Sequence, residues 1–190
     1  MVIQLLQTVP DWIFDPAAAE IDKINWGAIS DPTRRSQAFV SSTAVHIRVH
    51  KTPGIWPTTI EEWSEVVDCI DQRLNIKAYP DTVKLMNWVA KQVAGIQLGR
   101  VMIVRLEAGG SVGLHTDTGK YFKVHSRFHV PIKTNHTVLF GNEHVIQDHM
   151  PARTLCRLNN LEPHRLQNNG NDYRIHVIVD VACPGGNQIF

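Results

Sequence analysis

The spacing of hydrophobic residues changes near residue 100 of the chain. Before this point, two stretches carry apolar residues three or four positions apart, which is the period of an amphipathic helix. After it, short segments alternate apolar and polar residues and are separated by turns rich in glycine and asparagine. The pattern therefore predicts helices in the first half of the chain and a set of short strands in the second.

In the first half, residues 58–75, TTIEEWSEVVDCIDQRLN, are predicted to form a capped helix. Two threonines precede an acidic first turn, and the apolar residues then recur at helical spacing. A second helix is predicted between residues 80 and 95, which open with a proline and close with a glycine. Residues 44–50, AVHIRVH, alternate strictly and predict a strand. On that strand His46 and His50 are either metal ligands or, as we favour, its solvent-facing side.

The second half predicts a sandwich or barrel, because many short strands follow one another with turns and no helix between them. The two-sheet jelly roll fits this length best. We expect a single domain over residues 1–190, with an N-terminal helical and lid region, 1–99, packed on a core of residues 100–184. The predicted strands are RVMIVRLE (100–107), GLHTD (113–117), SRFHVPI (126–132), HTVLF (136–140), ARTLCRLNN (152–160) and YRIHVIVDVA (173–182).

Composition narrows the possible partners and the compartment. The 190 residues carry 19 Lys and Arg against 18 Asp and Glu, so no basic field exists to hold nucleic acid or an anionic membrane. No apolar run is long enough to span a bilayer, and the N-terminus lacks a basic leader. The cysteines, Cys69, Cys156 and Cys183, are odd in number and form no CxxC pair, so we expect them to be reduced and mostly buried. These features predict a soluble, cytoplasmic protein that binds neither nucleic acid nor membrane; they carry no indication of oligomeric state.

Candidate metal chemistry lies in the strand half, which holds eight of the ten histidines. His115 and Asp117 are two residues apart, so on an extended backbone both side chains leave the same face. His164, 49 residues downstream of His115, is the best third ligand. Two histidines and one carboxylate form the facial triad of non-haem Fe(II) oxygenases, which leaves positions for a chelating cosubstrate and O2. The alternative is that His115 and Asp117 belong to an ordinary turn before Gly119.

A second set of polar residues could bind an anion. Arg127 and His129 share one face of a predicted strand, and Arg174 opens the last strand, ten residues after His164. A buried arginine calls for an anion, and a carboxylate held by its guanidinium is the usual solution. A dicarboxylate that chelates iron at one end needs such a cation at the other. Alternatively, Arg174 pairs with a structural acid such as Asp180 or Glu162.

From about Val101 to Val181 the sequence resembles the aspartyl/asparaginyl beta-hydroxylase family of Fe(II)- and 2-oxoglutarate-dependent dioxygenases. The resemblance rests on three motifs in order, VRLEAGGSVGLHTDTG, SRFHVPI and EPHRLQNNGNDYRIHVIVDV. It implies a mainly β fold with N-terminal helices, in which the core is a double-stranded beta-helix, a cupin-like jelly roll. It also implies oxidative decarboxylation of 2-oxoglutarate to succinate coupled to hydroxylation of the substrate.

The resemblance also implies roles for individual residues. His115 and His164 match the family's iron ligands, and Arg127, His129 and Arg174 match its contacts with 2-oxoglutarate. The animal members lack a carboxylate ligand, whereas this chain has Asp117 and is similar in that respect to the smaller microbial and phage-type members. The expected substrate is an amino acid or an amino-acid side chain in a peptide.

Two further expectations concern the surroundings of the site. Residues 31–57 precede the core and are polar, so we expect a lid there. Within it Arg34, Arg35 or Arg48 holds a substrate carboxylate or, as we favour, is solvated. The family's strand before the glycine turn can carry a serine that contacts 2-oxoglutarate; MIVRLEAGG offers no hydroxyl, and alternation leaves the facing of Arg105 open.

Three other functions fit the same residues. The first is a cupin-like enzyme that uses His115, Asp117 and His164 with zinc or manganese, in which Arg174 has no role. The second is a ligand-binding sandwich with a structural metal. The third is a module that binds 2-oxoglutarate as a sensor without turnover, against which the complete triad argues.

Overall fold

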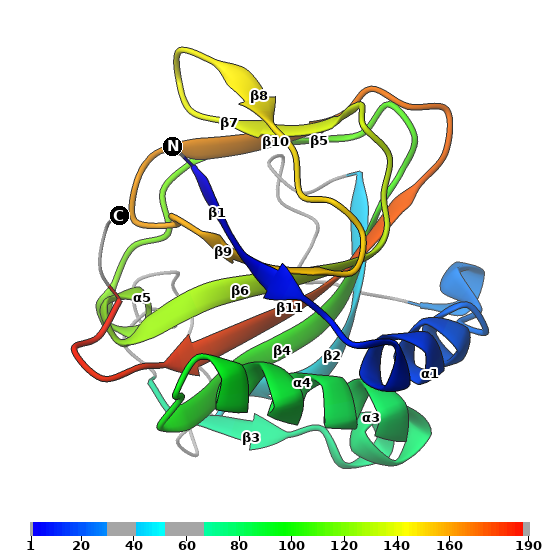
Figure 1. The fold of residues 1–190 in the computed structure, drawn as a ribbon, viewed down its shortest axis with the longest axis vertical. Coiled ribbons are helices and arrows are strands. Elements are labelled where there is room, and N and C mark those ends of the chain that lie inside the picture. Colours follow the sequence, from blue (N-terminus) through cyan, green and yellow to red (C-terminus); the bar gives the residue numbers. More distant parts are fainter. Residues whose placement is uncertain (1, 30–40, 52–66, 188–190) are drawn as a thin grey trace.

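The computed structural model describes residues 2–29, 41–51 and 67–187 and consists of two antiparallel sheets with helices on one side (Figure 1). The major sheet has the strand order β1-β9-β6-β11-β4-β2-β3 and the minor sheet the order β5-β10-β7-β8. The strands of the major sheet are β1 (Ile3–Thr8), β9 (Thr154–Leu158), β6 (His125–Lys133), β11 (Arg174–Ala182), β4 (Gln97–Leu106), β2 (Ser42–His50) and β3 (Cys69–Asp71). The minor sheet contains β5 (Ser111–His115), β10 (His164–Asn168), β7 (Val138–Gly141) and β8 (Ile146–Asp148). The predicted mainly β jelly roll with N-terminal helices is confirmed.

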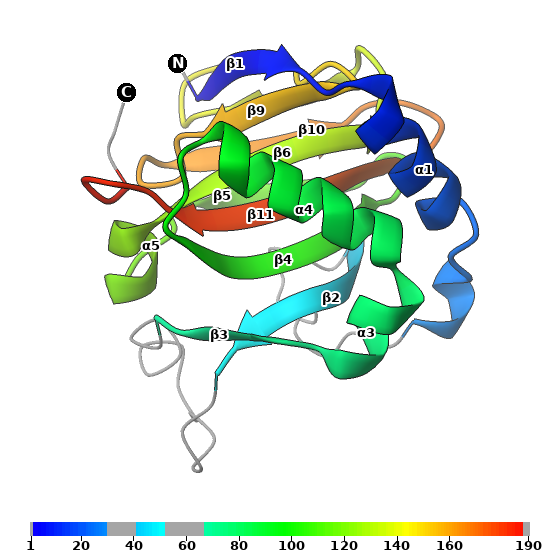
Figure 2. The same cartoon turned by 60° about the horizontal axis from the view of Figure 1, so that its bottom comes forward.

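The helices cover the face of the major sheet that points away from the minor sheet (Figure 2). They are α1 (Asp11–Ile21), α3 (Arg73–Ala78) and α4 (Pro80–Gln92), with a short 3-10 turn at Trp26–Ala28. A further helix, α5 (Lys120–Val124), lies at the end of the major sheet where β6 begins. Apolar side chains of α1 and α4 pack on alternate residues of β4, β6 and β11 and form the largest hydrophobic core. The predicted helix that starts at Pro80 is confirmed.

β11 shows how strand alternation divides the molecule. Ile175, Val177, Val179 and Val181 belong to the core beneath the helices. The intervening residues therefore point between the two sheets, and they are Arg174, His176, Ile178 and Asp180, all buried. Three of these four inward residues are charged or polar, which marks the inter-sheet space as the place for chemistry.

The predicted helix over residues 58–75 is wrong for residues 67–72, and of its described residues only 73–75 are helical. Residues 58–66 lie outside the described part, Cys69–Asp71 is strand β3, and helix α3 begins only at Arg73. β3 pairs with the end of β2, and the Arg48 guanidinium bonds both the carbonyl of Cys69 and the carboxylate of Asp71. Pairing with a sheet edge outweighs the local helical period here.

The first 99 residues contribute strands as well as helices. β1, β2 and β3 all belong to the major sheet, and β1 and α1 are elements that the hydrophobic pattern did not reveal. Of the predicted lid, residues 31–40 and 52–57 lie outside the described part, including Arg34 and Arg35. Its described portion is mainly β2, whose predicted strand character is confirmed.

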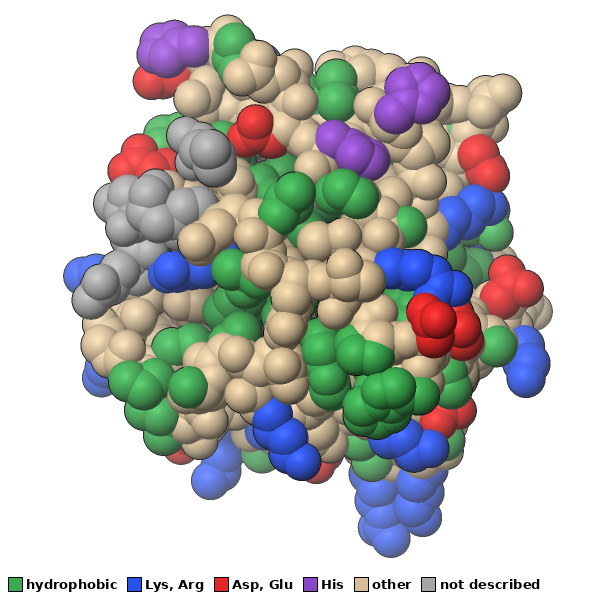
Figure 3. Space-filling model, viewed as in Figure 1, with side chains coloured by type: hydrophobic (Ala, Val, Ile, Leu, Met, Phe, Trp, Pro, Cys, Tyr) green, Lys and Arg blue, Asp and Glu red, His purple; other side chains and the backbone are tan. Residues whose placement is uncertain are grey.

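The outer surface agrees with the nearly balanced charge of the sequence. On the face shown in Figure 3, basic and acidic side chains are interspersed. Among the described residues, no helix has both the length and the apolar character needed to cross a membrane.

Candidate metal centre

His115, Asp117 and His164 come together at one end of the minor sheet. His115 is the last residue of β5, His164 is the first of β10, and the two face each other in the antiparallel register. Asp117 follows two residues after His115. One potential ligand atom from each of the three side chains lies within 4.8 Å of the others. Among the described residues, these three form the one cluster of His, Cys, Asp or Glu side chains that is close enough to hold a metal ion. Such spacing suits one metal ion.

Local backbone contacts orient both imidazoles. The Nδ1–H of His115 donates to the carbonyl of Gly113 at 2.8 Å, and that of His164 donates to the carbonyl of Glu162 at 2.9 Å. With the proton on Nδ1, each ring presents the lone pair of Nε2, which is the form that ligates a metal. Burial lowers the pKa of His164, which keeps this ring neutral at neutral pH.

Asp117 is held through one of its two carboxylate oxygens. Its Oδ2 accepts hydrogen bonds from Arg127 Nη1 at 2.9 Å and from Asn160 Nδ2 at 3.0 Å, and its backbone N–H donates to the carbonyl of Asn160 at 3.0 Å. Its Oδ1 lies 4.0 Å from His115 Nε2. A carboxylate fixed in this way directs Oδ1 toward the space shared with the histidines.

The sequence model of the Aspartyl/Asparaginyl beta-hydroxylase family matches residues 26–184 of the chain. The match spans most of the molecule and includes all three candidate ligands. The chain belongs to this family. It is therefore related to hydroxylases, and the family resemblance seen in the three sequence motifs is confirmed.

Solved structures support the jelly-roll fold of this aspartyl/asparaginyl beta-hydroxylase family member. An oxidoreductase of the 2OG-Fe(II) oxygenase family from Burkholderia pseudomallei has a TM-score of 0.57 at 12% identity, over 87% of this chain and 77% of that one. A prolyl hydroxylase from Trichoplax adhaerens, solved with a hypoxia inducible factor peptide, has a TM-score of 0.62 at 9% identity, over 96% and 84%. A prolyl-4-hydroxylase from Pseudomonas putida has a TM-score of 0.52 at 11% identity, over 95% and 91%. No curated protein matches the chain in sequence.

Arg127 makes contacts that differ from those the family resemblance implies. Its Nε and Nη2 donate to the two oxygens of Asp180 at 2.8 and 2.9 Å, while Nη1 holds Asp117. Burial opposes ionisation of Asp180, but Arg127 outweighs it and keeps the pKa of this carboxyl far below its ordinary value. In this structure Arg127 therefore acts on the metal ligand, and its predicted contact with 2-oxoglutarate stays a prediction.

His129, His176 and Arg174 form a second buried group between the sheets. The Nδ1 atoms of the two histidines lie 3.2 Å apart, so one ring donates and the other accepts. Both Nε2 atoms are buried and have no hydrogen-bond partner among the described residues. Burial, followed by the charge of Arg174, lowers the pKa of both histidines well below its ordinary value. A cation and unsatisfied imidazole nitrogens in a buried space fit the carboxylate of a cosubstrate such as 2-oxoglutarate.

Sequence reasoning missed three polar residues of this site. Asn160 and Asp180 support the ligand sphere, and His176 pairs with His129. Asp180 and His176 carried a signal, because each interrupts an apolar strand at an inward position. Asp180 pairs with Arg127, although the sequence suggested it as a partner of Arg174.

Other candidate residues face elsewhere. Arg105 pairs with Glu107 at 2.9 Å and stacks on Tyr173 at 4.0 Å. Arg48 bonds Asp71 and backbone carbonyls of neighbouring strands, so its cation is used within the fold. Neither His46 nor His50 belongs to the metal-ligand group of the described residues, in agreement with the reading of both as one side of a strand.

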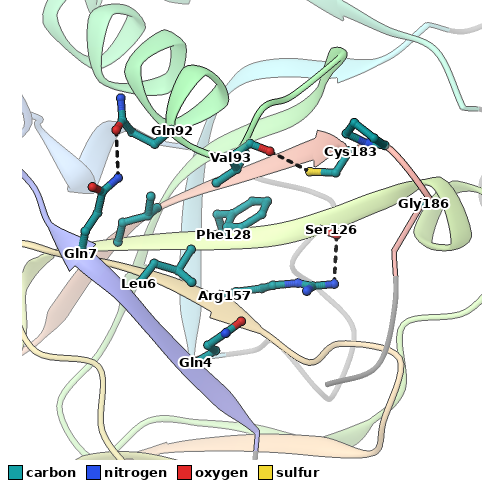
Figure 4. Close-up of a pocket in the computed structure, with 12 residues that line it drawn as sticks. Gln4, Leu6, Gln7, Gln92, Val93, Ser126, Phe128, Arg157, Cys183 and Gly186 are labelled. Atoms are coloured by element: carbon teal, nitrogen blue, oxygen red, sulfur yellow. Dashed lines mark hydrogen bonds between the residues drawn. The ribbon is translucent and has the colours of Figure 1, made fainter.

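A pocket of about 560 Å³ lies on the other side of the major sheet, beside α4 and β1 (Figure 4). Phe128 lines it, whereas its neighbours Arg127 and His129 point between the sheets. The pocket is therefore separate from the metal centre. Its lining includes Gln4, Leu6, Gln7, Gln92, Val93, Ser126, Leu155, Arg157, Cys183, Pro184 and Gly186.

Proposed function

We propose that the protein is an Fe(II)- and 2-oxoglutarate-dependent dioxygenase that hydroxylates an amino acid or an amino-acid side chain in a peptide, with release of succinate and CO2. The observation that carries the proposal is the close approach of His115, Asp117 and His164, within 4.8 Å of one another. Membership of a hydroxylase family supports the same reaction class.

The donor set fits Fe(II). His115 and His164 would each ligate through Nε2 and Asp117 through Oδ1, which makes a two-histidine, one-carboxylate set with open positions. When bound, iron supplies the activation of O2 that the protein's own side chains cannot perform. Asn160 and Arg127 contribute by keeping Oδ2 of Asp117 occupied, so that the carboxylate presents a single oxygen to the metal.

The second buried group fits the cosubstrate. Arg174 would pair with the distal carboxylate of 2-oxoglutarate, and the imidazoles of His129 and His176 offer an N–H within the same space. The contact between the two Nδ1 atoms fixes the orientation of both rings. The neutral ring that accepts at Nδ1 carries its proton on Nε2, so this ring offers the Nε2–H donor. Burial of all three residues keeps water away from the chelated cosubstrate.

The proposal is tested by adding Fe(II) and then 2-oxoglutarate to the protein under anaerobic conditions. A visible charge-transfer absorption band should form, and in air succinate should appear. The Asp117→Ala protein is the control and should form no band. Absence of the band from the native protein, at metal concentrations that saturate the site, contradicts the proposal.

The same experiment separates the other functions. A cupin-like enzyme or a structural metal site that uses the triad gives no 2-oxoglutarate-dependent band. A sensor gives the band without succinate. Arg174 favours the dioxygenase over the first two, because it brings a buried cation close to the two buried histidines.

A further inference from the structure

Arg100 extends the polar contacts of the metal centre across the major sheet. It lies on β4 at an irregularity in the pairing with β11, where Val179 faces Val101 and Val181 faces Leu98. Its Nε approaches Asp180 Oδ2 at 3.4 Å, and the same oxygen receives Arg127 Nη2 at 2.9 Å. Arg100 therefore lies on the inner side of the sheet, next to the residues that hold the metal ligand.

Aromatic residues of α5 fix the position of this guanidinium. Its central carbon lies 4.6 Å from the ring centroid of Tyr121 and 4.9 Å from that of Phe122. Arg127 contacts the same Phe122 ring at 5.0 Å. The backbone N–H of Arg100 donates to the Tyr121 hydroxyl at 2.7 Å, and this hydroxyl donates to Asp180. The cation is thus held in place with little freedom, although 22% of its side chain is exposed.

Arg100 still has hydrogen-bonding capacity toward a ligand. Its contact with Asp180 uses Nε and is longer than the two bonds from Arg127, which already satisfy both oxygens of that carboxylate. Within the described part of the chain, its terminal Nη1 and Nη2 donate to no acceptor. Five N–H donors on an arginine form a planar fork that matches a carboxylate.

Of the two guanidinium groups at Asp180, that of Arg100 keeps its terminal donors available to a ligand. Arg127 is committed to Asp117 and Asp180, whereas the contact of Arg100 with Asp180 uses only Nε. Because Asp180 already pairs with Arg127, the Arg100 guanidinium can receive the carboxylate of a ligand.

We propose that Arg100 binds a carboxylate of the substrate, which makes the substrate an anionic amino acid or peptide. This inference rests on the proposed function. The backbones of Arg100 on β4 and Arg127 on β6 are separated by β11 and therefore lie two strand spacings, or roughly 10 Å, apart. Their guanidinium groups both reach Asp180 between these strands. Next to Arg100 on the inner face, Ala44, Met102, Val104 and Ile178 form a buried apolar cluster. The carboxylate of the substrate would pair with the Nη1 and Nη2 groups of Arg100.

The carboxylate has two possible sources, and the experiment separates them. One panel contains the standard free amino acids and their α-amides. The other contains capped peptides with Asp or Glu and the same peptides with Asn or Gln. Succinate release in air is measured with each compound, above the rate without substrate, for the native protein and for Arg100→Gln and Arg100→Lys.

At least one carboxylate compound should stimulate succinate release about tenfold more than its matched amide. Arg100→Gln should raise the KM for that compound about tenfold or more and leave the KM for 2-oxoglutarate unchanged, and Arg100→Lys should restore part of the loss. Arg105→Gln is the matched control, because Arg105 lies on the same strand and pairs with Glu107. It should behave like the native protein.

Three outcomes overturn the inference. They are equal stimulation by acid and amide, an unchanged KM in Arg100→Gln, and no stimulation by any carboxylate although the anaerobic iron–2-oxoglutarate band forms. If the band itself does not form, the proposed function fails, and the inference fails with it.

Discussion

Arg127 and Asp180 form a bidentate ion pair next to the candidate metal ligand Asp117, with Nε···Oδ1 and Nη2···Oδ2 distances of 2.8 and 2.9 Å. The two residues are paired in the register of β6 and β11, and both are buried. The remaining arm of Arg127 bonds Asp117, so the position of a metal ligand on a loop depends on the most central strands of the fold. A ligand supported in this way needs no rearrangement to receive a metal.

Removing one partner of this pair should destabilise the protein strongly. Asp180→Asn leaves the buried Arg127 without its main counter-charge, so the free energy of unfolding should fall by roughly 3–5 kcal/mol. Asp71→Asn is the control, because the Asp71 side chain is half exposed and its pair with Arg48 should be worth roughly 0–1 kcal/mol. Urea unfolding of the metal-free proteins measures both. Equal, small losses in the two variants would contradict a structural role for the buried pair.

Asn160 should affect metal affinity although it is not itself one of the candidate ligands. It is fully buried and bonds Asp117 through both its side chain and its backbone carbonyl. Asn160→Ala removes the side-chain bond and should weaken metal binding about 10–100-fold. Anaerobic titration with Co(II), followed by its visible absorption, measures the affinity. Asn142→Ala, which alters a surface turn at His144 and Val145, should bind Co(II) like the native protein.

Sequence reasoning found the parts of the site whose positions follow from strand alternation. His115 and Asp117 had to share a direction, as did Arg127 and His129 on β6, and Arg174 was recognised at the start of β11. Sequence reasoning missed His176 and Asp180 as residues of the site, although each interrupts the apolar strand β11. It could not find Asn160, because a loop asparagine that bonds a carboxylate looks like any turn residue. It misread Cys69–Asp71 because β3 exists through pairing with β2, which lies about twenty residues earlier in the chain. Contacts between distant segments leave no local period in the sequence.

Arg174 should determine the affinity for 2-oxoglutarate but not for the metal. It is buried, and its charge lowers the pKa of both His129 and His176, whereas Asp117 is held by Arg127 and Asn160. Arg174→Gln removes the charge that is proposed to pair with the distal carboxylate of 2-oxoglutarate, and loss of one partner of a buried ion pair costs roughly 2 kcal/mol or more. The Kd of 2-oxoglutarate should therefore rise about 30-fold or more, as measured by the charge-transfer band. Co(II) affinity should stay unchanged.

Arg153→Gln serves as the control for this prediction. Arg153 carries the same charge but pairs with Asp11 and Asp15 on the surface. The variant should bind 2-oxoglutarate like the native protein. A band that titrates identically in Arg174→Gln and in the native protein would remove Arg174 from the cosubstrate site.

The buried histidine pair should make the metal-free protein sensitive to mild acid. Burial and the charge of Arg174 lower the pKa of His176, so it stays neutral in the folded state, whereas in the unfolded chain it titrates at roughly 6.5. Its contribution to stability is therefore complete above that pH and is lost as the pH falls below it, by up to about 1.4 kcal/mol per pH unit. Urea unfolding at pH 7.5 and 5.5, with a chelator present, should show a smaller loss for His176→Phe than for the native protein. His144→Gln alters an exposed histidine and should lose as much stability as the native protein does. If His176→Phe loses as much unfolding free energy between pH 7.5 and 5.5 as the native protein does, His176 is not buried in its neutral form.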